Sequence, residues 1–231
     1  MATSARPTAT VLARAVGHLR RHGLTSLAHA GWARLDDRWY DLRRGTDTAG
    51  TLGLEHLAIP HRHKANGIYY GPTQRGPFRH LLRTLAPPKD GTFVDVGCGK
   101  GKALLMALEH GFHRVRGLDF SAELCAVARQ NLEIMGRRRG LPCPAEVLHC
   151  DATEYDLQPD ERVFYLFNPF DERVMAGFVD NLVRSLARHP RPIWLIYCHP
   201  DHGPIIEARA PFLRPTHRHV RGTPFAVYTG S

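Results

Sequence analysis

The stretch Thr92–Lys102, TFVDVGCGKGK, decides the fold of this chain. It begins with a short apolar run, Phe93–Val96, that contains one aspartate and predicts a strand. Three glycines follow at alternate positions, and an apolar helical run, Ala103–Leu108, comes after them. A strand that turns through glycines into a helix points the first N–H groups of that helix at a bound ligand, and glycines let the ligand approach closely. The stretch therefore predicts a nucleotide-type cofactor site.

Spacing separates three kinds of glycine loop. The three glycines are Gly97, Gly99 and Gly101. A phosphate-binding P-loop has serine or threonine after its lysine, whereas Lys102 is followed by Ala103. The dinucleotide fingerprint G-x-G-x-x-G would place glycine at position 102, which is the same lysine. The pattern that remains is D-x-G-x-G-x-G, with its acid at Asp95.

This pattern resembles motif I of the class I S-adenosylmethionine (SAM) methyltransferases. The resemblance implies SAM as the cofactor and a binding site that includes Asp95, Gly97, Cys98, Gly99 and Gly101. SAM carries an ammonium and a sulfonium group and no phosphate, so an acid beside the glycines suits it better than it suits a pyrophosphate. A nicotinamide oxidoreductase is disfavoured because the third glycine of its fingerprint is missing.

Polar residues also follow the next predicted strands, Val115–Leu118 and Glu146–Cys150. An acid after the second strand of a doubly wound sheet accepts hydrogen bonds from ribose hydroxyls. By resemblance Asp119 is that acid and Phe120 lies beside the adenine, while Asp151-Ala152 matches the motif whose acid meets the adenine amino group. Aspartates after strands are also ordinary turn residues. Their recurrence after successive strands favours the methyltransferase interpretation.

The fourth predicted strand, Val163–Phe167, ends in Asn168-Pro169-Phe170. This resembles the [DN]-P-P-[YF] motif of amino-methylating enzymes. There the asparagine side chain and the proline carbonyl accept hydrogens from the amine. The resemblance implies that Asn168, Pro169 and Phe170 are catalytic and that Asn168 also meets the cofactor. Here one proline replaces two, which leaves the backbone path open, and Asn-Pro is also a common start of a turn.

Upstream of the glycine stretch, Ile68–Gln74 reads IYYGPTQ. It resembles the Y-x-P-T segment that precedes motif I in several methyltransferase groups. The resemblance implies that Thr73 binds the cofactor and that Tyr69 or Tyr70 lines the substrate entrance, with Tyr70 the catalytic candidate. A plain Gly-Pro turn is the alternative.

Strands and helices alternate regularly along the rest of the chain. A fifth strand is predicted over Ile193–Cys198, and two further strands over Thr216–Val220 and Phe225–Thr229 form a hairpin. Helices are predicted over Phe78–Leu85, Ser121–Gly136 and Asp171–Arg188. The alternation predicts an α/β fold: a doubly wound, mostly parallel, seven-stranded sheet with a C-terminal antiparallel hairpin.

The N-terminal residues lie outside the resemblance. Val11–Leu19 has an apolar helical face, and a second amphipathic helix begins at Leu24 and stops near Gly45. Such helices can lie on membranes, but we favour a lid or a homodimer contact. We therefore expect a helical extension over residues 1–60 and a methyltransferase domain over residues 61–231.

Composition limits the remaining classes. The 231 residues carry a net charge of +9, which permits nucleic acid as a partner. The tightest basic cluster, Arg137–Arg139, is expected in a solvated loop without the interleaved aromatic residues of a single-strand binder, so nucleic acid is not favoured. No apolar run approaches the ~20 residues that span a bilayer. Five cysteines without a C-x-x-C pair favour the cytoplasm, and the H-x-H pairs lack zinc-like partners, so no metal is expected.

The acceptor of the methyl group is the least determined feature. Asn168-Pro169-Phe170 favours a nitrogen atom of a protein, peptide or small metabolite. Methylation of oxygen would usually involve a base such as histidine; His199 and His202 are available, although both are expected in a loop. O-methylation of a small molecule and methylation of RNA stay as alternatives. The alternative without catalysis is a regulatory module that binds SAM.

Overall fold

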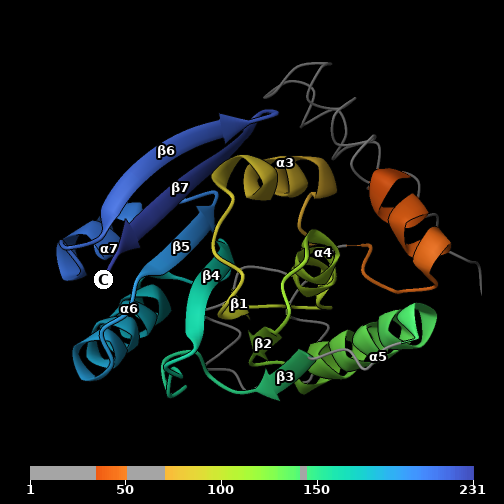
Figure 1. Cartoon of the computed structure of the whole chain (residues 1–231), viewed down its shortest axis with the longest axis horizontal. Coiled ribbons are helices and arrows are strands. Elements are labelled where there is room, and N and C mark those ends of the chain that lie inside the picture. Colours follow the sequence, from red (N-terminus) through yellow and green to blue (C-terminus); the bar gives the residue numbers. More distant parts are fainter. Residues whose placement is uncertain (1–34, 51–70, 141–144) are drawn as a thin grey trace, which may run out of the picture.

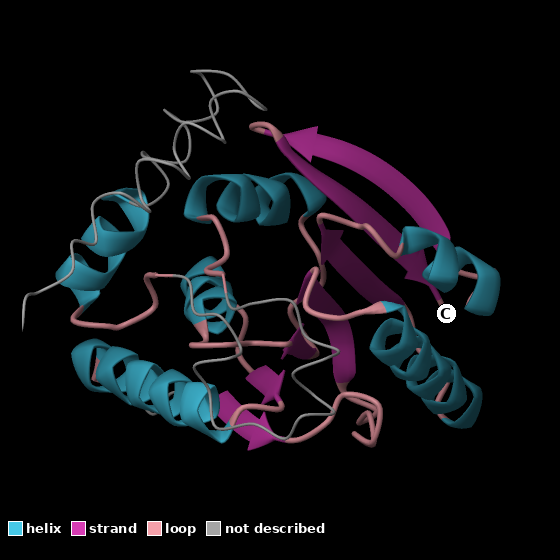
Figure 2. Ribbon diagram, turned by 180° about the vertical axis from the view of Figure 1, so that it is seen from behind, coloured by secondary structure: helices cyan, strands magenta, loops and turns pink. Residues whose placement is uncertain are grey.

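The structure is a computed structural model that describes residues 35–50, 71–140 and 145–231. One seven-stranded sheet forms the middle layer, and helices cover both of its faces (Figure 1, Figure 2). The strand order is β3-β2-β1-β4-β5-β7-β6. The chain therefore winds outward from β1 in one direction and then from β4 in the other, which confirms the doubly wound sheet that the alternation predicts.

The sheet is parallel except for β7. Strands β1 to β5 pair in parallel, and β7 lies antiparallel to both β5 and β6. Each predicted strand end lies within two residues of the observed one. The strands are β1 (Thr92–Val96), β2 (Val115–Asp119), β3 (Ala145–His149), β4 (Glu161–Phe167), β5 (Ile193–Cys198), β6 (Arg214–Val220) and β7 (Thr223–Gly230).

Two apolar cores hold the layers together. The helices are α3 (Arg75–Leu85), α4 (Lys102–His110), α5 (Ala122–Arg139), α6 (Glu172–Arg188) and α7 (Gly203–Arg209). On one face α3, α4 and α5 contribute residues such as Phe78 and Leu104 to a buried cluster. On the other face α6 and α7 contribute residues such as Phe178 and Ile206. The sheet is thus buried on both sides, as parallel sheets usually are.

Local sequence explains where α5 begins and ends. Ser121 caps its N-terminus, since its hydroxyl oxygen accepts a hydrogen bond from Leu124 N at 3.2 Å. The helix continues past Gly136 through Arg139, so the three arginines expected in a loop form its last turn. It ends at Gly140, whose backbone is left-handed with φ +65°, a conformation that glycine adopts easily at a helix C-terminus. Basic side chains are favourable in that turn because they oppose the helix dipole.

A two-residue turn places the terminal hairpin and also positions the loop after β5. Arg221 and Gly222 have φ of +51° and +82°, the combination that a tight type I′ hairpin requires. Val220 pairs with Thr223 across this turn. Pro224, just inside β7, accepts a hydrogen bond from His199 N at 3.0 Å. The hairpin therefore helps to fix the residue that follows β5.

Residues 35–44 form a helix that packs beside α4 and α5, shown in orange in Figure 1. Gly45, with φ +68°, follows it, as the predicted stop requires. Tyr40 from this helix is fully buried in the core cluster of α3 and α4. The predicted helix Val11–Leu19 and residues 24–34 of the second helix lie outside the described residues. In the part of the chain that the structure describes, no helix combines the length and apolar character required to cross a bilayer.

Candidate active site

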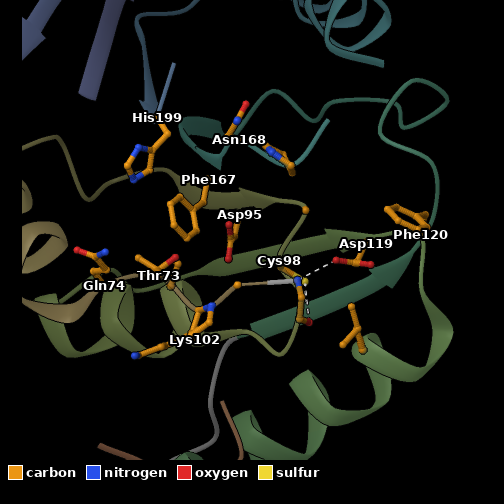
Figure 3. Close-up of a pocket in the computed structure, with 17 residues that line it drawn as sticks. Thr73, Gln74, Asp95, Cys98, Lys102, Asp119, Phe120, Phe167, Asn168 and His199 are labelled. Atoms are coloured by element: carbon orange, nitrogen blue, oxygen red, sulfur yellow. Dashed lines mark hydrogen bonds between the residues drawn. The ribbon is translucent and has the colours of Figure 1, made fainter. Parts of the chain in front are cut away.

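A cavity of about 240 Å³ lies at the carboxyl ends of the central strands (Figure 3). This is the switch point between β1 and β4, where open α/β sheets bind their ligands. Its walls come from the segment before α3, the glycine loop, the end of β2 and the residues after β4 and β5. The lining residues are Gly71, Pro72, Thr73, Gln74, Asp95, Gly97, Cys98, Gly99, Lys102, Ala103, Asp119, Phe120, Leu124, Phe167, Asn168, Pro169 and His199.

The glycine loop brings the two halves of the sheet edge into contact. Gly97 has φ +80°, which an L side chain rarely adopts. A Cβ at Gly97 would lie only 2.5 Å from Cβ of Pro169, the residue that lines the cavity after β4. Glycine is therefore required here twice over, for the turn and for the close approach. The N–H groups of Gly97 and Cys98 both donate to the carbonyl of Leu118, at 2.8 and 2.9 Å.

Asp119 is buried at the end of β2 and ties the loop to this strand. Its Oδ2 accepts a hydrogen bond from Gly99 N at 2.8 Å (Figure 3), and its Oδ1 accepts one from Ser121 N at 2.9 Å. Burial raises the pKa of Asp119 to about 6, although these two donors oppose the rise. Each carboxylate oxygen keeps a further acceptor position. Asp119 can therefore accept hydrogen bonds from a ligand when it is ionised.

Asp95 is a buried carboxyl group without a donor among the described residues. It is 4% exposed and lines the cavity, and no described group donates a hydrogen bond to it. Burial raises the pKa of Asp95 well above its usual range, and the nearby Asp119 carboxylate adds to the rise. A buried carboxylate is unfavourable unless it is paired. The position therefore suits a cationic group of a ligand.

Asn168 follows β4 in a left-handed conformation, φ +39°, and its amide group is held at both ends. Its Nδ2 donates to Asp201 Oδ2 at 2.6 Å, and its Oδ1 accepts from the Tyr197 hydroxyl at 2.8 Å. These partners fix the orientation of the amide. A carbonyl oxygen has two lone pairs, so Oδ1 can accept one further hydrogen bond.

His199 directly follows β5 and lines the same cavity as Asn168 (Figure 3). It is also left-handed, with φ +52°, and its ring packs against Phe167 with 5.5 Å between the ring centroids. Burial lowers the pKa of His199 below its usual value, while Asp201 opposes the change. The imidazole is therefore neutral near pH 7 and can accept a proton. Backbone strain of this kind is typical of functional sites.

The structure brings most of the predicted site residues to this cavity. They are Thr73, Asp95, Gly97, Cys98, Gly99, Asp119, Phe120, Asn168 and Pro169. Gly101 instead caps α4, with φ +80°, while Ala152 and Phe170 are buried in the core on the α6 side. Asp151 accepts hydrogen bonds from Thr153 N and Oγ1 at 2.8 and 2.7 Å, as in a turn. Tyr70 lies outside the described residues.

Gln74, Phe167 and His199 line the cavity but are not among the predicted site residues. Gln74 is held by the hairpin, because Thr223 Oγ1 donates to its Oε1 at 3.1 Å across 149 positions of sequence. No local pattern predicts such a contact. Phe167 lies one residue before the predicted motif and appears in the sequence only as the end of a strand. The sequence suggests His199 only as a base for methylation of oxygen, although it follows a strand at the same sheet edge as the other site residues.

Known proteins resemble this chain in sequence and in fold. Residues 93–192 match the family model of a methyltransferase domain. The chain is 30% identical over 135 residues to the ribosomal protein L11 methyltransferase of Gloeobacter violaceus. The alignment covers 52% of this chain and 42% of that protein. It thus spans less than half the length of this curated relative.

Solved structures give the same fold. A SAM-dependent methyltransferase from Aquifex aeolicus superposes with a TM-score of 0.51 and 18% identity, over 66% of this chain and 88% of that one. A protein of Listeria monocytogenes described as a predicted N6-adenine-specific DNA methylase gives a TM-score of 0.53 and 16% identity, over 69% and 52% of the two chains. Likeness at this level of identity establishes the fold.

Proposed function

We propose that the chain is a class I, Rossmann-like SAM-dependent methyltransferase, and that it methylates a nitrogen atom of a protein, a peptide or a small metabolite. The observation that carries the proposal is Asn168, whose amide lines the cavity in an orientation fixed by Tyr197 and Asp201. The remaining acceptor position of its carbonyl suits an N–H group of the acceptor.

The residues around the glycine loop fit SAM. Asp95 offers a buried carboxylate without a described donor, which suits the ammonium group of the cofactor. Asp119 offers free acceptor positions that suit the ribose hydroxyls. Pro169 and the glycines approach each other so closely that a single Cβ at Gly97 would close the space between them. SAM supplies a methyl group bound to a sulfonium. Once the methyl group has been transferred, the rest of the cofactor is a neutral thioether.

The acceptor nitrogen must present a free lone pair for the transfer. We assign its orientation to Asn168, which accepts one N–H hydrogen and so directs the lone pair elsewhere. An amine is largely protonated at neutral pH, and the proton must leave before the nitrogen can react. The neutral imidazole of His199 lines the same cavity and can take that proton. Because the leaving group is neutral, no acid has to assist it, and alignment carries most of the catalysis.

The proposal that the acceptor is a protein rests on one curated relative. The Gloeobacter violaceus relative is named as a methyltransferase of a ribosomal protein, which supports a protein as the acceptor. That likeness extends over only 42% of the relative. A peptide or small metabolite with an amino group therefore belongs to the same proposal.

A second candidate function is O-methylation of a small molecule. The specific observation in its favour is the position of His199, because a hydroxyl acceptor loses its proton to a neutral base during transfer. Under this alternative Asn168 would hold the acceptor oxygen without selecting its lone pair. The two candidates therefore differ in which acceptor atom, nitrogen or oxygen, receives the methyl group.

The test is transfer of a labelled methyl group from SAM to a panel of amino-bearing peptides, small amines, phenols and RNA. We expect label on an amine with the native protein and a loss of about 100-fold in the Asn168→Ala variant. The control is Asn181→Ala, which removes an asparagine that binds backbone carbonyls outside the cavity. Full turnover in Asn168→Ala would overturn the proposal, and label found only on phenols would establish the second candidate.

We also propose that the reaction takes place in the cytoplasm. Cys98, Cys125, Cys150 and Cys198, the four cysteines that the structure describes, are free thiols. Free thiols persist in a reducing compartment. Fractionation of cells that produce the tagged chain tests this location.

A further inference from the structure

The glycine loop is anchored from outside the region that matches the methyltransferase family. Lys100 and Lys102 are the two lysines of this loop, and each reaches an acid of residues 35–50. The ammonium of Lys102 pairs with Asp37 on the helix of residues 35–44. The ammonium of Lys100 lies 2.8 Å from Asp47 Oδ1 and 3.3 Å from the carbonyl oxygen of Ala49.

The Lys102 pair is buried, and this makes Asp37 important. Only 2% of the Lys102 side chain and 11% of the Asp37 side chain are exposed. Burial raises the pKa of Asp37, and Lys102 opposes the rise. The ring of Tyr40 closes the site, 5.3 Å from the Lys102 ammonium. A buried ammonium without its partner is strongly unfavourable, so loss of Asp37 would force Lys102, the first residue of α4, to move.

The Lys100 contact is built into a rigid turn. Asp41 holds residues 46–49 in shape, accepting hydrogen bonds from Thr48 N at 2.8 Å and Ala49 N at 2.6 Å. Asn131 on α5 then joins this turn to the loop. Its Oδ1 accepts from Asp47 N at 2.8 Å, and its Nδ2 donates to the carbonyls of Asp47 and Lys100 at 3.0 and 2.9 Å. The turn and the glycine loop therefore share one clamp.

We propose that Asp37 and Asp47 are positioning residues of the cofactor site, and that they hold the glycine loop in its binding geometry through Lys102 and Lys100. The inference rests on the proposed binding of SAM at this loop. Glycines give the loop unusual conformational freedom, while Gly97, Gly99 and Lys102 all line the cavity. Contacts that restrict the loop before the ligand arrives reduce the entropic cost of binding. Residues 35–50 thus belong to the site although the family match begins at Phe93.

The experiment is calorimetric titration with S-adenosylhomocysteine, which requires no knowledge of the acceptor. We expect Asp37→Asn to raise the dissociation constant about tenfold, a typical coupling between linked groups.

The matched control is Arg44→Met, on the same helix. Arg44 Nε pairs with Glu109 Oε1 at 2.5 Å, near the far end of α4 from the glycine loop. Arg44→Met should lower the urea midpoint of unfolding and leave the dissociation constant unchanged. If Asp37→Asn behaves in the same way, Asp37 only stabilises the fold and the proposal fails for it.

Asp47→Asn keeps the proposal testable if Asp37→Asn does not fold. The Asp47 side chain is 69% exposed, so its loss should be tolerated. We expect an affinity for S-adenosylhomocysteine about threefold weaker, because exposed ion pairs contribute little. An unchanged affinity would overturn the role of Asp47. Failure of the native chain to bind S-adenosylhomocysteine at all would instead overturn the assignment of the cofactor.

Discussion

The two sides of the cavity are built in different ways. On the side of β1 and β2, Asp95 and Asp119 are buried, and Asp119 is held by backbone N–H groups within the glycine loop and the turn after β2. On the side of β4 and β5, Asn168 and His199 are half-buried and left-handed, and side chains hold the Asn168 amide. The first side is a backbone cradle, and the second is a network of side chains.

This difference has a consequence for recognition. A backbone cradle depends on glycines and on an acid at fixed spacing, so few substitutions at its glycine positions preserve its shape. A side-chain network can change its chemistry by single substitutions without altering the fold. We infer that the β1–β2 side determines the cofactor, and that the β4–β5 side determines which acceptor is methylated.

The largest effect is expected at Gly97, where the two sides touch. Alanine there would combine a left-handed φ of +80° with a Cβ 2.5 Å from Pro169. We expect a loss of about 3 kcal/mol of folding free energy from strain and overpacking together. Affinity for S-adenosylhomocysteine should also fall, because both walls of the cavity must move. Urea unfolding and calorimetry measure the two effects.

Gly222→Ala is the control for this prediction. Gly222 has nearly the same φ, +82°, but nothing lies within 4 Å of a Cβ built there. It should cost only about 1 kcal/mol of folding free energy, the left-handed strain alone. Its affinity for the ligand should be unchanged. Equal losses in both variants would show that the contact with Pro169 does not matter.

The same contrast explains which parts of the site the sequence could predict. The glycine loop and Asp119 lie within a short stretch, so spacing was enough to bring them to one cavity. Strand ends came within two residues because buried parallel strands are apolar and turn residues bound them. The network of Asn168, Tyr197 and Asp201 joins positions 29 and 33 residues apart. Its partners depend on how β4 and β5 pair, which no local pattern contains.

The contacts of residues 35–50 were also beyond prediction. Asp47 lies just beyond the predicted end of the second helix near Gly45, and its hydrogen bonds to Asn131 connect positions 84 residues apart. The spacing of apolar residues along a helix predicts which face is buried, but not which partner Asn131 contacts from that helix. A buried amide there gave no signal of its partner. Ion pairs such as Asp37 with Lys102 are likewise set by the docking of one helix on another.

The next largest effect concerns His199 on the acceptor side. His199→Gln should lower turnover about 100-fold, because general bases contribute on that scale. Affinity for S-adenosylhomocysteine should stay the same, since the substitution does not touch the backbone cradle. A parallel loss of affinity would mean that His199 supports the cofactor instead.

The pH dependence of native turnover sharpens this assignment. The pKa of His199 is lowered, so the imidazole remains a base down to pH values below its ordinary 6.5. Turnover should therefore fall only at pH values below 6.5, where the imidazole becomes protonated. Asp201 is the charged group that acts on the imidazole, and Asp95 and Asp119 line the same cavity. In His199→Gln the acid limb that belongs to the imidazole should vanish.

A smaller effect is expected from the titration of Asp119. Its pKa in the folded state is about 6, above the ordinary 3.8, so the folded chain holds this proton more tightly than the unfolded chain. The contribution of that proton to stability is present below pH 3.8 and is lost as the pH rises to about 6. Ligand binding should change in the opposite direction, because only the carboxylate accepts hydrogen bonds on all its lone pairs.

Calorimetry from pH 5 to pH 7 measures this dependence. We expect affinity for S-adenosylhomocysteine to rise about tenfold over the range. Asp119→Asn should remove the part of this pH dependence that belongs to Asp119. An affinity that is independent of pH in the native chain would contradict the role of Asp119 as an ionised acceptor.

The smallest effect is expected from Tyr197→Phe, which removes one hydrogen bond of the acceptor-side network. The Tyr197 hydroxyl donates to Asn168 Oδ1 at 2.8 Å, and its loss frees the amide without removing it. Turnover should fall about fivefold, as one hydrogen bond of about 1 kcal/mol implies. Affinity for S-adenosylhomocysteine should not change. Tyr228→Phe is the matched control, because Tyr228 is equally buried but its hydroxyl contacts Gly203 and Glu207 on α7. If both variants lost the same activity, the effect would come from packing in β5 and β7, and the orientation of Asn168 would not depend on Tyr197.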